Sequence, residues 1–260
     1  MTRMMIVPAA GLGSRLGVPI PKVLARVAGR PMIDHLFQLY AGTIQRFVVV
    51  ASQAGRGLLA GHLQGRPELT DLVVQAEPTG MLDAILLARS HVERHQPDRV
   101  WITWCDQVAV RRETVAGMSD ADASAPEPAM VLPTCIGPDP YIHFDRDPSG
   151  RIVAVRQRRE GDAMPAAGES DMGVFSLSRA AYLEDLRAYD RAAARGRATG
   201  ERNFLPFIPW LAASGRVVSF PCTDPIEAVG INTPEDLRRI EAHLLAGAGP
   251  PGASAIRPES

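Results

Sequence analysis

Two basic residues follow the first apolar run of the chain at a short spacing. Residues 4–9 are apolar, the loop Ala9–Gly13 consists mainly of alanine and glycine, and Arg15 and Lys22 come next. Small residues let backbone N–H groups approach a polyanion closely, and fixed cations can then neutralise its charge. The stretch therefore indicates a phosphate-binding loop. The alternative is an ordinary strand-to-helix turn whose Arg15 and Lys22 face water.

Two well-known phosphate-binding fingerprints do not fit this loop. The dinucleotide pattern Gly-x-Gly-x-x-Gly requires glycine where the chain has Leu16, and an acidic residue after the second strand, which instead ends in Ser52 and Gln53. The Gly-Lys-Ser/Thr sequence of the P-loop is absent from the chain. The loop therefore predicts a cradle for a different phosphate compound.

Alternating apolar and amphipathic runs predict the elements that hold this loop. Strand-like runs occur at residues 4–9, 47–51, 72–75 and 100–104. Helix-like stretches, including 31–40 and 81–92, lie between them. Continuous apolar strands separated by helices are typical of a parallel sheet covered on both faces, which is an α/β architecture. Ligands bind beyond the carboxyl ends of such strands, here after Ala9, Gln75 and Trp104.

The pattern changes after residue 118. Residues 119–128 are rich in turn-forming types and are predicted to be a loop. Shorter strand-like runs follow at 130–135, 141–145, 152–156, 173–177 and 216–220. The first four predict a small antiparallel lobe built on the main sheet, with a hairpin turn at 147–150. Helix-like stretches are expected at 179–194 and 204–213.

The last helix has a clear start signal. Thr233 is a good N-cap, Pro234 suits the first helical position, and Asp236 completes a capping box. Residues 247–260 are rich in glycine, proline and serine, which predicts a disordered tail.

Four motifs in chain order resemble those of the sugar-phosphate nucleotidyltransferases. The chain is most similar to the uridylyltransferase domain of bacterial N-acetylglucosamine-1-phosphate uridylyltransferases, from about residue 4 to about residue 245. The matching stretches are Ala9–Arg15 with Pro21-Lys22, Gln75–Gly80, Trp104–Asp106 and Gly230–Thr233. The resemblance implies a mostly parallel, Rossmann-like α/β sheet with helices on both faces and a small antiparallel acceptor-binding lobe. It also implies one domain over residues 1–246, with a nucleotide-binding half at about 1–118 and an acceptor-binding part at about 129–232.

In the reaction that this resemblance implies, a phosphate oxygen of an acceptor attacks the α-phosphorus of a nucleoside triphosphate, and pyrophosphate leaves. A sugar phosphate is already anionic at pH 7, so catalysis depends on positioning and electrostatics rather than on a general base. The resemblance implies that Arg15 and Lys22 are the catalytic cations. It implies Mg²⁺ as cofactor, held by Asp106 and Asn232. The alternatives are a helix N-cap for Asp106 and a turn residue for Asn232.

The resemblance also implies a set of substrate-binding residues. Those for the nucleotide are Pro8, Ala9, Ala10, Gly11, Gly13, Gln75, Gly80 and Met81. Gln75 carries both hydrogen-bond donors and an acceptor, which suits the edge of a pyrimidine. The alternative is that Gln75 is only a polar residue at the end of a strand. Those for the acceptor are Cys105, Tyr141, Gln157 and Asp171.

The acceptor side departs from the family pattern. Cys105, Gln157 and Asp171 stand where the family has glycine, glutamate and asparagine, and Ile142-His143 replaces Gly-Arg after Tyr141. The nucleotide motif also differs, since Met81-Leu82-Asp83 replaces Thr-Gly-His. We therefore expect the same reaction with a different acceptor.

The function predicted is the joining of an NTP, with UTP favoured, to a sugar 1-phosphate. The alternative is a cytidylyl- or guanylyltransferase that acts on a cyclitol, polyol or phosphonate. A non-catalytic nucleotide sensor is a more distant possibility. The chain contains no hexapeptide β-helix repeats, the pattern of an acetyltransferase domain, so no acetyl transfer is expected.

Charge and hydropathy restrict the partners. The formal net charge of −1 argues against broad binding to nucleic acid or anionic membranes. No apolar run reaches the roughly 20 residues of a transmembrane helix, and no signal peptide is recognisable, so a cytoplasmic location is expected. The three cysteines are far apart and are predicted to be free thiols. The sequence does not determine the oligomeric state.

One further motif lies outside these assignments. His91 and His95 are four residues apart, a spacing that could bind a metal ion. The sequence shows no obvious third ligand, and cationic residues suit the end of a helix. The favoured interpretation is therefore a surface helix end.

Overall fold

The computed structural model describes residues 1–11, 13, 16–65 and 70–247. Its central sheet has eight strands, which are β1 (Arg3–Ala9), β4 (Arg46–Ser52), β5 (Thr70–Gln75), β6 (Arg99–Thr103), β7 (Met130–Pro138), β10 (Ala167–Asp171), β11 (Val174–Ser178) and β12 (Val217–Pro221). The strand order is β10-β7-β11-β6-β1-β4-β5, and β12 pairs with β7. Strand β1 is parallel to β4 and β6, and β4 is parallel to β5. The predicted α/β fold with a mostly parallel sheet is confirmed.

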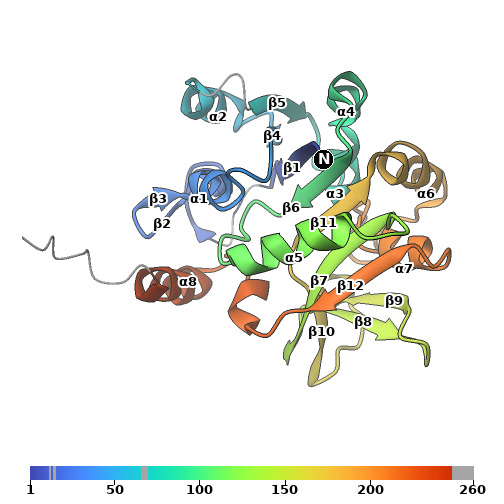
Figure 1. Cartoon of the computed structure of the whole chain (residues 1–260). Helices are drawn as coiled ribbons and strands as arrows, with labels where there is room; N and C mark the ends of the chain where they lie inside the picture. Colours follow the sequence, from blue (N-terminus) through green and yellow to red (C-terminus); the bar gives the residue numbers. More distant parts are fainter. Residues whose placement is uncertain (12, 14–15, 66–69, 248–260) are drawn as a thin grey trace, which may run out of the picture.

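Helices cover both faces of this sheet (Figure 1). They are α1 (Met32–Leu39), α2 (Arg56–Leu63), α3 (Met81–Leu86), α4 (Arg89–His95), α5 (Arg112–Asp122), α6 (Leu186–Ala192), α7 (Phe207–Ala212) and α8 (Pro234–Gly247). Side chains alternate along a strand, so successive residues of β1 enter two separate cores. Met4 and Ile6 pack with α3, α4, α6 and α7, whereas Met5 and Val7 pack with α1, α2, α5 and α8.

The antiparallel part is divided between two sheets. Strand β11 runs antiparallel to β6 and β7, and β10 runs antiparallel to β7, so these strands extend the central sheet. Strands β8 (Ile142–Arg146) and β9 (Ile152–Gln157) form a separate hairpin. Its predicted turn is confirmed, because Gly150 N donates to Asp147 O over 2.9 Å and Gly150 has a φ of +84°. A second small sheet joins β2 (Arg26–Val27) and β3 (Arg30–Pro31).

The prediction of a loop over residues 119–128 is wrong at its start, because α5 continues to Asp122. Thr114, Met118 and Asp122 recur at helical spacing, and all three are buried. Asp122 is a polar residue at a core position of this helix. The local sequence therefore resembled a solvated turn, and only a partner elsewhere in the fold makes the burial of Asp122 favourable.

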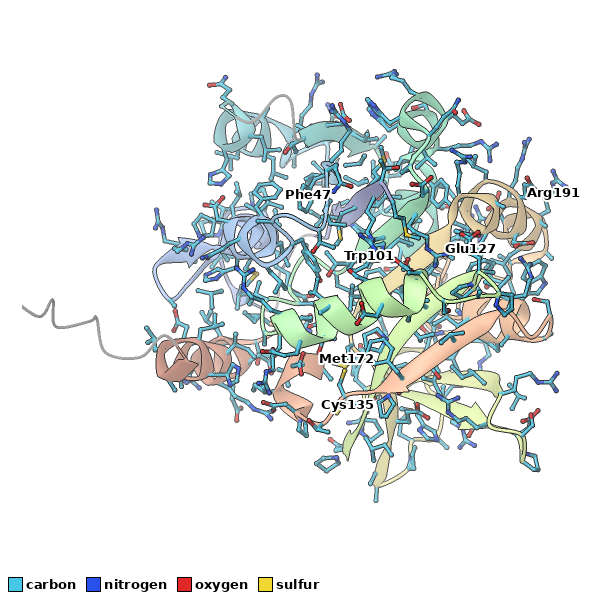
Figure 2. The ribbon with its side chains drawn as sticks, in the orientation of Figure 1. Phe47, Trp101, Glu127, Cys135, Met172 and Arg191 are labelled. Atoms are coloured by element: carbon cyan, nitrogen blue, oxygen red, sulfur yellow. The ribbon has the colours of Figure 1, made fainter. Side chains whose placement is uncertain are left out.

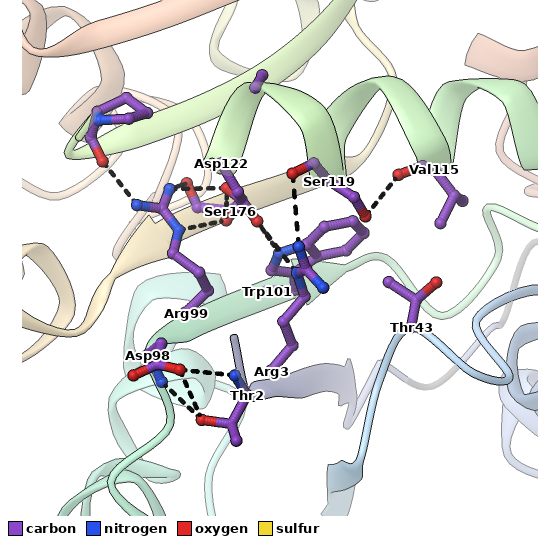
Figure 3. Close-up of polar contacts among 12 residues, drawn as sticks. Thr2, Arg3, Thr43, Asp98, Arg99, Trp101, Val115, Ser119, Asp122 and Ser176 are labelled. Atoms are coloured by element: carbon purple, nitrogen blue, oxygen red, sulfur yellow. Dashed lines mark hydrogen bonds and ion pairs between the residues drawn. The ribbon is translucent and has the colours of Figure 1, made fainter. Parts of the chain in front are cut away.

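That partner is Arg99 on β6 (Figure 3). Arg99 Nη2 lies 2.9 Å from Asp122 Oδ1, and neither side chain is exposed to solvent. Ser176 Oγ and Trp101 Nε1 donate to the same carboxylate over 2.6 and 2.8 Å. Figure 2 labels Trp101, which is completely buried. The buried charges are thus fully hydrogen-bonded, which attaches α5 to the sheet.

Two predicted helices are interrupted. The helix expected over 81–92 is divided into α3 and α4, and that expected over 179–194 begins with a π-helical turn at Ala181–Asp185 before α6.

The capping box of α8 is confirmed, since Asp236 N donates to Thr233 Oγ1 over 3.1 Å and Thr233 N donates to Asp236 Oδ2 over 2.8 Å. The predicted tail beyond Gly247 lies outside the described residues. Among those described, no helix has the length and apolar character needed to cross a membrane.

Candidate active site

Three of the predicted residues meet at the carboxyl edge of the sheet. Lys22 Nζ donates a hydrogen bond to the Asp106 carboxylate and another, of 2.9 Å, to Asn232 Oδ1. These partners are 84 and 210 residues from Lys22 in sequence. Lys22 follows the loop after β1, Asp106 follows β6, and Asn232 precedes α8. The side chains of Lys22 and Asp106 are each only 12% exposed, so solvent screens this pair weakly.

Two glycines hold Lys22 in this position. A Cβ added at Gly13 would lie 2.9 Å from Lys22 Cβ, so the loop after β1 packs directly on the lysine. A Cβ at Gly55 would lie 2.8 Å from Pro21 Cγ, so the turn between β4 and α2 supports the residue before Lys22. The 3-10 helix Lys22–Leu24 continues from Pro21, whose carbonyl accepts from Leu24 N over 2.8 Å. Backbone contacts on both sides thus restrict where Nζ can point.

Asp106 is held next to Asn232 by a backbone contact with the preceding residue, Ile231. Ile231 N donates to Asp106 O over 3.3 Å, and a Cβ at Gly230 would lie 3.2 Å from Asp106 Oδ2. The N-cap alternative for Asp106 is wrong, because the next helix, α5, has Arg111 at its cap position. Asn232 N donates to Asp236 Oδ2 over 3.0 Å, so the capping box of α8 also orients the asparagine.

The oxygen atoms of Asp106 and Asn232 suit a hard divalent cation. One is a carboxylate and the other an amide carbonyl, and both already contact a single ammonium group. The missing side chain of Gly230 leaves room next to the carboxylate. The donor set therefore fits the Mg²⁺ that the sequence resemblance implies. In that case Asp106 and Asn232 would hold the ion.

The predicted base-binding residues lie at the end of β5. Gln75 is buried, and its Nε2 donates to Gly80 O over 3.1 Å, so these two residues are adjacent as expected. Gln75 and Thr79 line a cavity of about 420 Å³, and its other lining residues are Ala76, Glu77, Asp83, Leu86 and Leu87. Met81 begins α3 and packs partly against the core.

The phosphate-loop residues follow β1 directly. Pro8 and Ala9 end β1 beside Val50 and Ala51 of β4, and Ala10, Gly11 and Gly13 continue into the loop. Gly13 has a φ of +60°, a conformation that side-chain-bearing residues adopt at a cost. Arg15 lies outside the described residues, so its role remains a prediction.

The four predicted acceptor residues are not gathered in one described cavity. Gln157 lines a separate cavity of about 280 Å³ with Glu160, Asp162, Tyr189, Ala194, Arg195, Gly196, Arg197, Asn203 and Pro206. Tyr141 is 47% exposed before β8. Cys105 adjoins Asp106, and its burial, together with the charge of Asp106, raises the pKa of its thiol to about 12. Their roles toward an acceptor remain predictions.

The Asp171 side chain makes a hydrogen bond with the backbone. Its Oδ1 accepts from Gly173 N over 2.8 Å in the turn between β10 and β11, and the residue is buried. Burial raises the pKa of Asp171 to about 6, although the Gly173 bond opposes this rise. The Asp171 side chain therefore stabilises this turn. Gln107 stabilises it as well, because its Nε2 donates to Met172 O over 2.8 Å.

Comparison with known proteins identifies the family. Residues 5–204 match the MobA-like NTP transferase domain. The chain belongs to this family. The bifunctional protein GlmU of Pelotomaculum thermopropionicum is 27% identical over 245 residues, which are 92% of this chain and 51% of that protein. GlmU of Anaeromyxobacter sp. is 31% identical over 249 residues, which are 92% of this chain and 48% of that protein. The chain thus spans about half the length of these curated relatives.

A solved structure shares the fold of this chain. It is described as the inositol-1-phosphate CTP transferase from T. maritima, with a TM-score of 0.66 and 19% sequence identity. The alignment covers 93% of this chain and 94% of that one. At this identity the likeness establishes the fold alone.

Several residues that position the candidate site were missed by sequence reasoning. Buried Glu227 accepts from Arg111 N over 2.8 Å and from Thr114 Oγ1 over 2.6 Å, which fixes the chain leading to Asn232 against α5. Arg202 holds the Gly80 segment, because its backbone N donates to Thr79 O over 2.9 Å and its carbonyl accepts from Leu82 N over 3.0 Å. No local pattern marks these residues, since each acts on a segment far away in sequence.

Proposed function

We propose that this chain transfers a nucleotidyl group from an NTP to a phosphorylated acceptor and releases pyrophosphate. The observation that carries the proposal is the meeting of Lys22, Asp106 and Asn232 beside the loop after β1. A cation and two oxygen ligands at this edge of a parallel sheet suit a reaction between two polyanions. We favour UTP and a sugar 1-phosphate as substrates, which agrees with the similarity to GlmU proteins.

In the proposed mechanism, a phosphate oxygen of the acceptor attacks the α-phosphorus, and the bond to the β-phosphate breaks. The acceptor oxygen is already anionic, so no residue has to remove a proton. Lys22 reduces the repulsion between the two substrates, and Arg15 is assigned to the departing β- and γ-phosphates. Mg²⁺, when held by Asp106 and Asn232, supplies further neutralisation of the phosphate charge.

The test is pyrophosphate release from a panel of five triphosphates (UTP, CTP, GTP, ATP and dTTP) with sugar 1-phosphates and polyol phosphates. We expect turnover with at least one pair, its loss in excess EDTA and its recovery with Mg²⁺. Asp106→Ala and Lys22→Ala should each lower kcat roughly 10²- to 10³-fold, as removal of a preorganised charge does elsewhere. Glu113→Gln on α5, 77% exposed, is the matched control and should retain full activity. Absence of turnover with every pair, or full activity in Asp106→Ala, would refute the proposal.

A second candidate is a cytidylyl- or guanylyltransferase that acts on a cyclitol, polyol or phosphonate. The observation in its favour is the hydrogen bonding of Gln75, whose amide nitrogen donates to both Gly80 O, over 3.1 Å, and Thr79 Oγ1, over 3.4 Å. The remaining carbonyl oxygen is an acceptor, which suits the N3–H of uracil and the amino group of cytosine equally. The same panel, widened to cyclitol phosphates and phosphonates, distinguishes the two candidates, since the preferred triphosphate and acceptor are read from one experiment.

A further inference from the structure

A three-residue cluster lies at the edge of the central sheet, away from the candidate active site. Asp71 is near the start of edge strand β5, and His91 and His95 occupy one face of α4. Asp71 Oδ2 lies 3.2 Å from His91 Nδ1 and 3.8 Å from His95 Nε2. The fold thus brings a third potential ligand to the two histidines, which the sequence had not indicated.

The spacing of these atoms matches a metal site. One ligand atom from each of the three residues lies within 4.8 Å of the others. Tetrahedral Zn²⁺ with bonds of about 2.0–2.1 Å places its ligand atoms about 3.3 Å apart, so only small movements are needed. His91 Nδ1 is buried and makes no hydrogen bond of acceptable geometry, although Asp71 is near. An imidazole nitrogen without a hydrogen-bond partner is therefore held next to a carboxylate and a second imidazole.

We propose that Asp71, His91 and His95 bind a transition-metal ion of the Zn²⁺ class. Two imidazoles and one carboxylate form a borderline donor set that Zn²⁺ and Co²⁺ accept and that Mg²⁺ disfavours. A water molecule would complete the coordination. Neutral imidazole is the form that binds a metal.

The position of the cluster indicates a structural role. Asp71 pairs with Val48, whereas Gln75 of the candidate active site pairs with Ser52 at the other end of the same two strands. Asp71 and Gln75 are four positions apart along β5, which corresponds to about 13 Å. A metal here would connect α4 to the unprotected edge of the sheet, independently of the transfer reaction.

Arg46 is a competing cation and provides a sharp test. Its Nη1 lies 3.3 Å from Asp71 Oδ2, the oxygen that faces both histidines. A guanidinium at this distance repels a divalent ion and occupies a lone pair of the carboxylate. Arg46→Gln should therefore tighten metal binding, whereas loss of a ligand should weaken it. An incidental surface ion pair does not predict this opposite pair of effects.

The experiment titrates metal-free protein with Zn²⁺ against a chromophoric chelator, and with Co²⁺ by visible absorption. We expect one equivalent to bind, with the intense visible bands of tetrahedral Co²⁺, and the thermal midpoint to rise with Zn²⁺. His91→Ala and Asp71→Asn should each weaken Zn²⁺ binding by at least roughly 10- to 100-fold, the loss that follows when a group that only supports a metal ligand is removed.

The matched control is His62→Ala, which removes the His62–Asp34 pair of 3.0 Å outside the cluster and should leave binding unchanged. If a ligand variant fails to fold, Arg46→Gln and the Co²⁺ spectrum of the parent protein still decide the matter. Binding that is unaltered in His91→Ala, or absence of tetrahedral Co²⁺ bands in the parent protein, would overturn the proposal.

Discussion

Gly13→Ala would show whether the loop after β1 sets the position of Lys22. The substitution removes no functional group, but its Cβ would lie 2.9 Å from Lys22 Cβ. Carbon atoms in contact prefer about 3.5–4.0 Å, so Lys22 has to move by roughly 0.6–1 Å. A misplacement of about 1 Å can reduce catalysis about 10²-fold. We expect kcat to fall roughly 10- to 100-fold.

Gly17→Ala is the matched control for backbone strain. Gly17 has a φ of +71°, close to the +60° of Gly13, but a Cβ there would meet no atom within 4 Å. Both variants should lose about 1–2 kcal/mol of stability because alanine disfavours positive φ. The thermal midpoint should fall by roughly 2–8 °C in each. Only Gly13→Ala should lose activity as well.

The assay is pyrophosphate release with the substrate pair found in the panel, together with thermal unfolding of both variants. Equal activity of Gly13→Ala and Gly17→Ala, at equal loss of stability, would refute the reasoning that contact with Gly13 positions Lys22.

Three further predictions concern stability. Burial raises the pKa of Asp171 from 3.8 to about 6, so ionisation of this carboxyl destabilises the fold as pH rises through this interval. The free energy of unfolding of Asp171→Asn, measured in urea, should therefore exceed that of the parent by up to about 3 kcal/mol at pH 7–8. Below pH 3.8 the two values should be equal. Asp122→Ala removes the buried carboxylate from Arg99 and leaves it with only the largely exposed Glu127 as a counter-ion. The change should cost about 3–5 kcal/mol in the same measurement, against less than about 0.5 kcal/mol for the exposed Glu113→Gln. Thr233→Ala removes the α8 cap and should cost about 1 kcal/mol, seen as a lower urea midpoint.

Much of the fold was predictable because its signals are local. The run at residues 4–9 became β1 and those near 47–51, 72–75 and 100–104 became β4, β5 and β6, since continuous apolar runs suit strands buried on both faces. The hairpin turn at 147–150 and the α8 capping box were predictable for the same reason. In each, residues a few positions apart satisfy one another's hydrogen bonds.

The site was predictable only as a set of separate motifs. The order of the motifs indicated which residues belong together, but not that one ammonium group contacts both Asp106 and Asn232. The supporting contacts of Gly55, Glu227 and Arg202 had no sequence signal, because each acts on a distant segment.

The sequence by itself determined the strands, the glycine-rich loop and the start of α8, because these depend on neighbours along the chain. Tertiary structure alone decided that Asp122 is buried in a helix rather than exposed in a loop, and that Asp71 faces His91 and His95. Both outcomes depend on a partner from another element. The energy of a buried charge or of a metal ligand is set by what the fold brings within a few ångströms of it, and a linear pattern does not contain that distance.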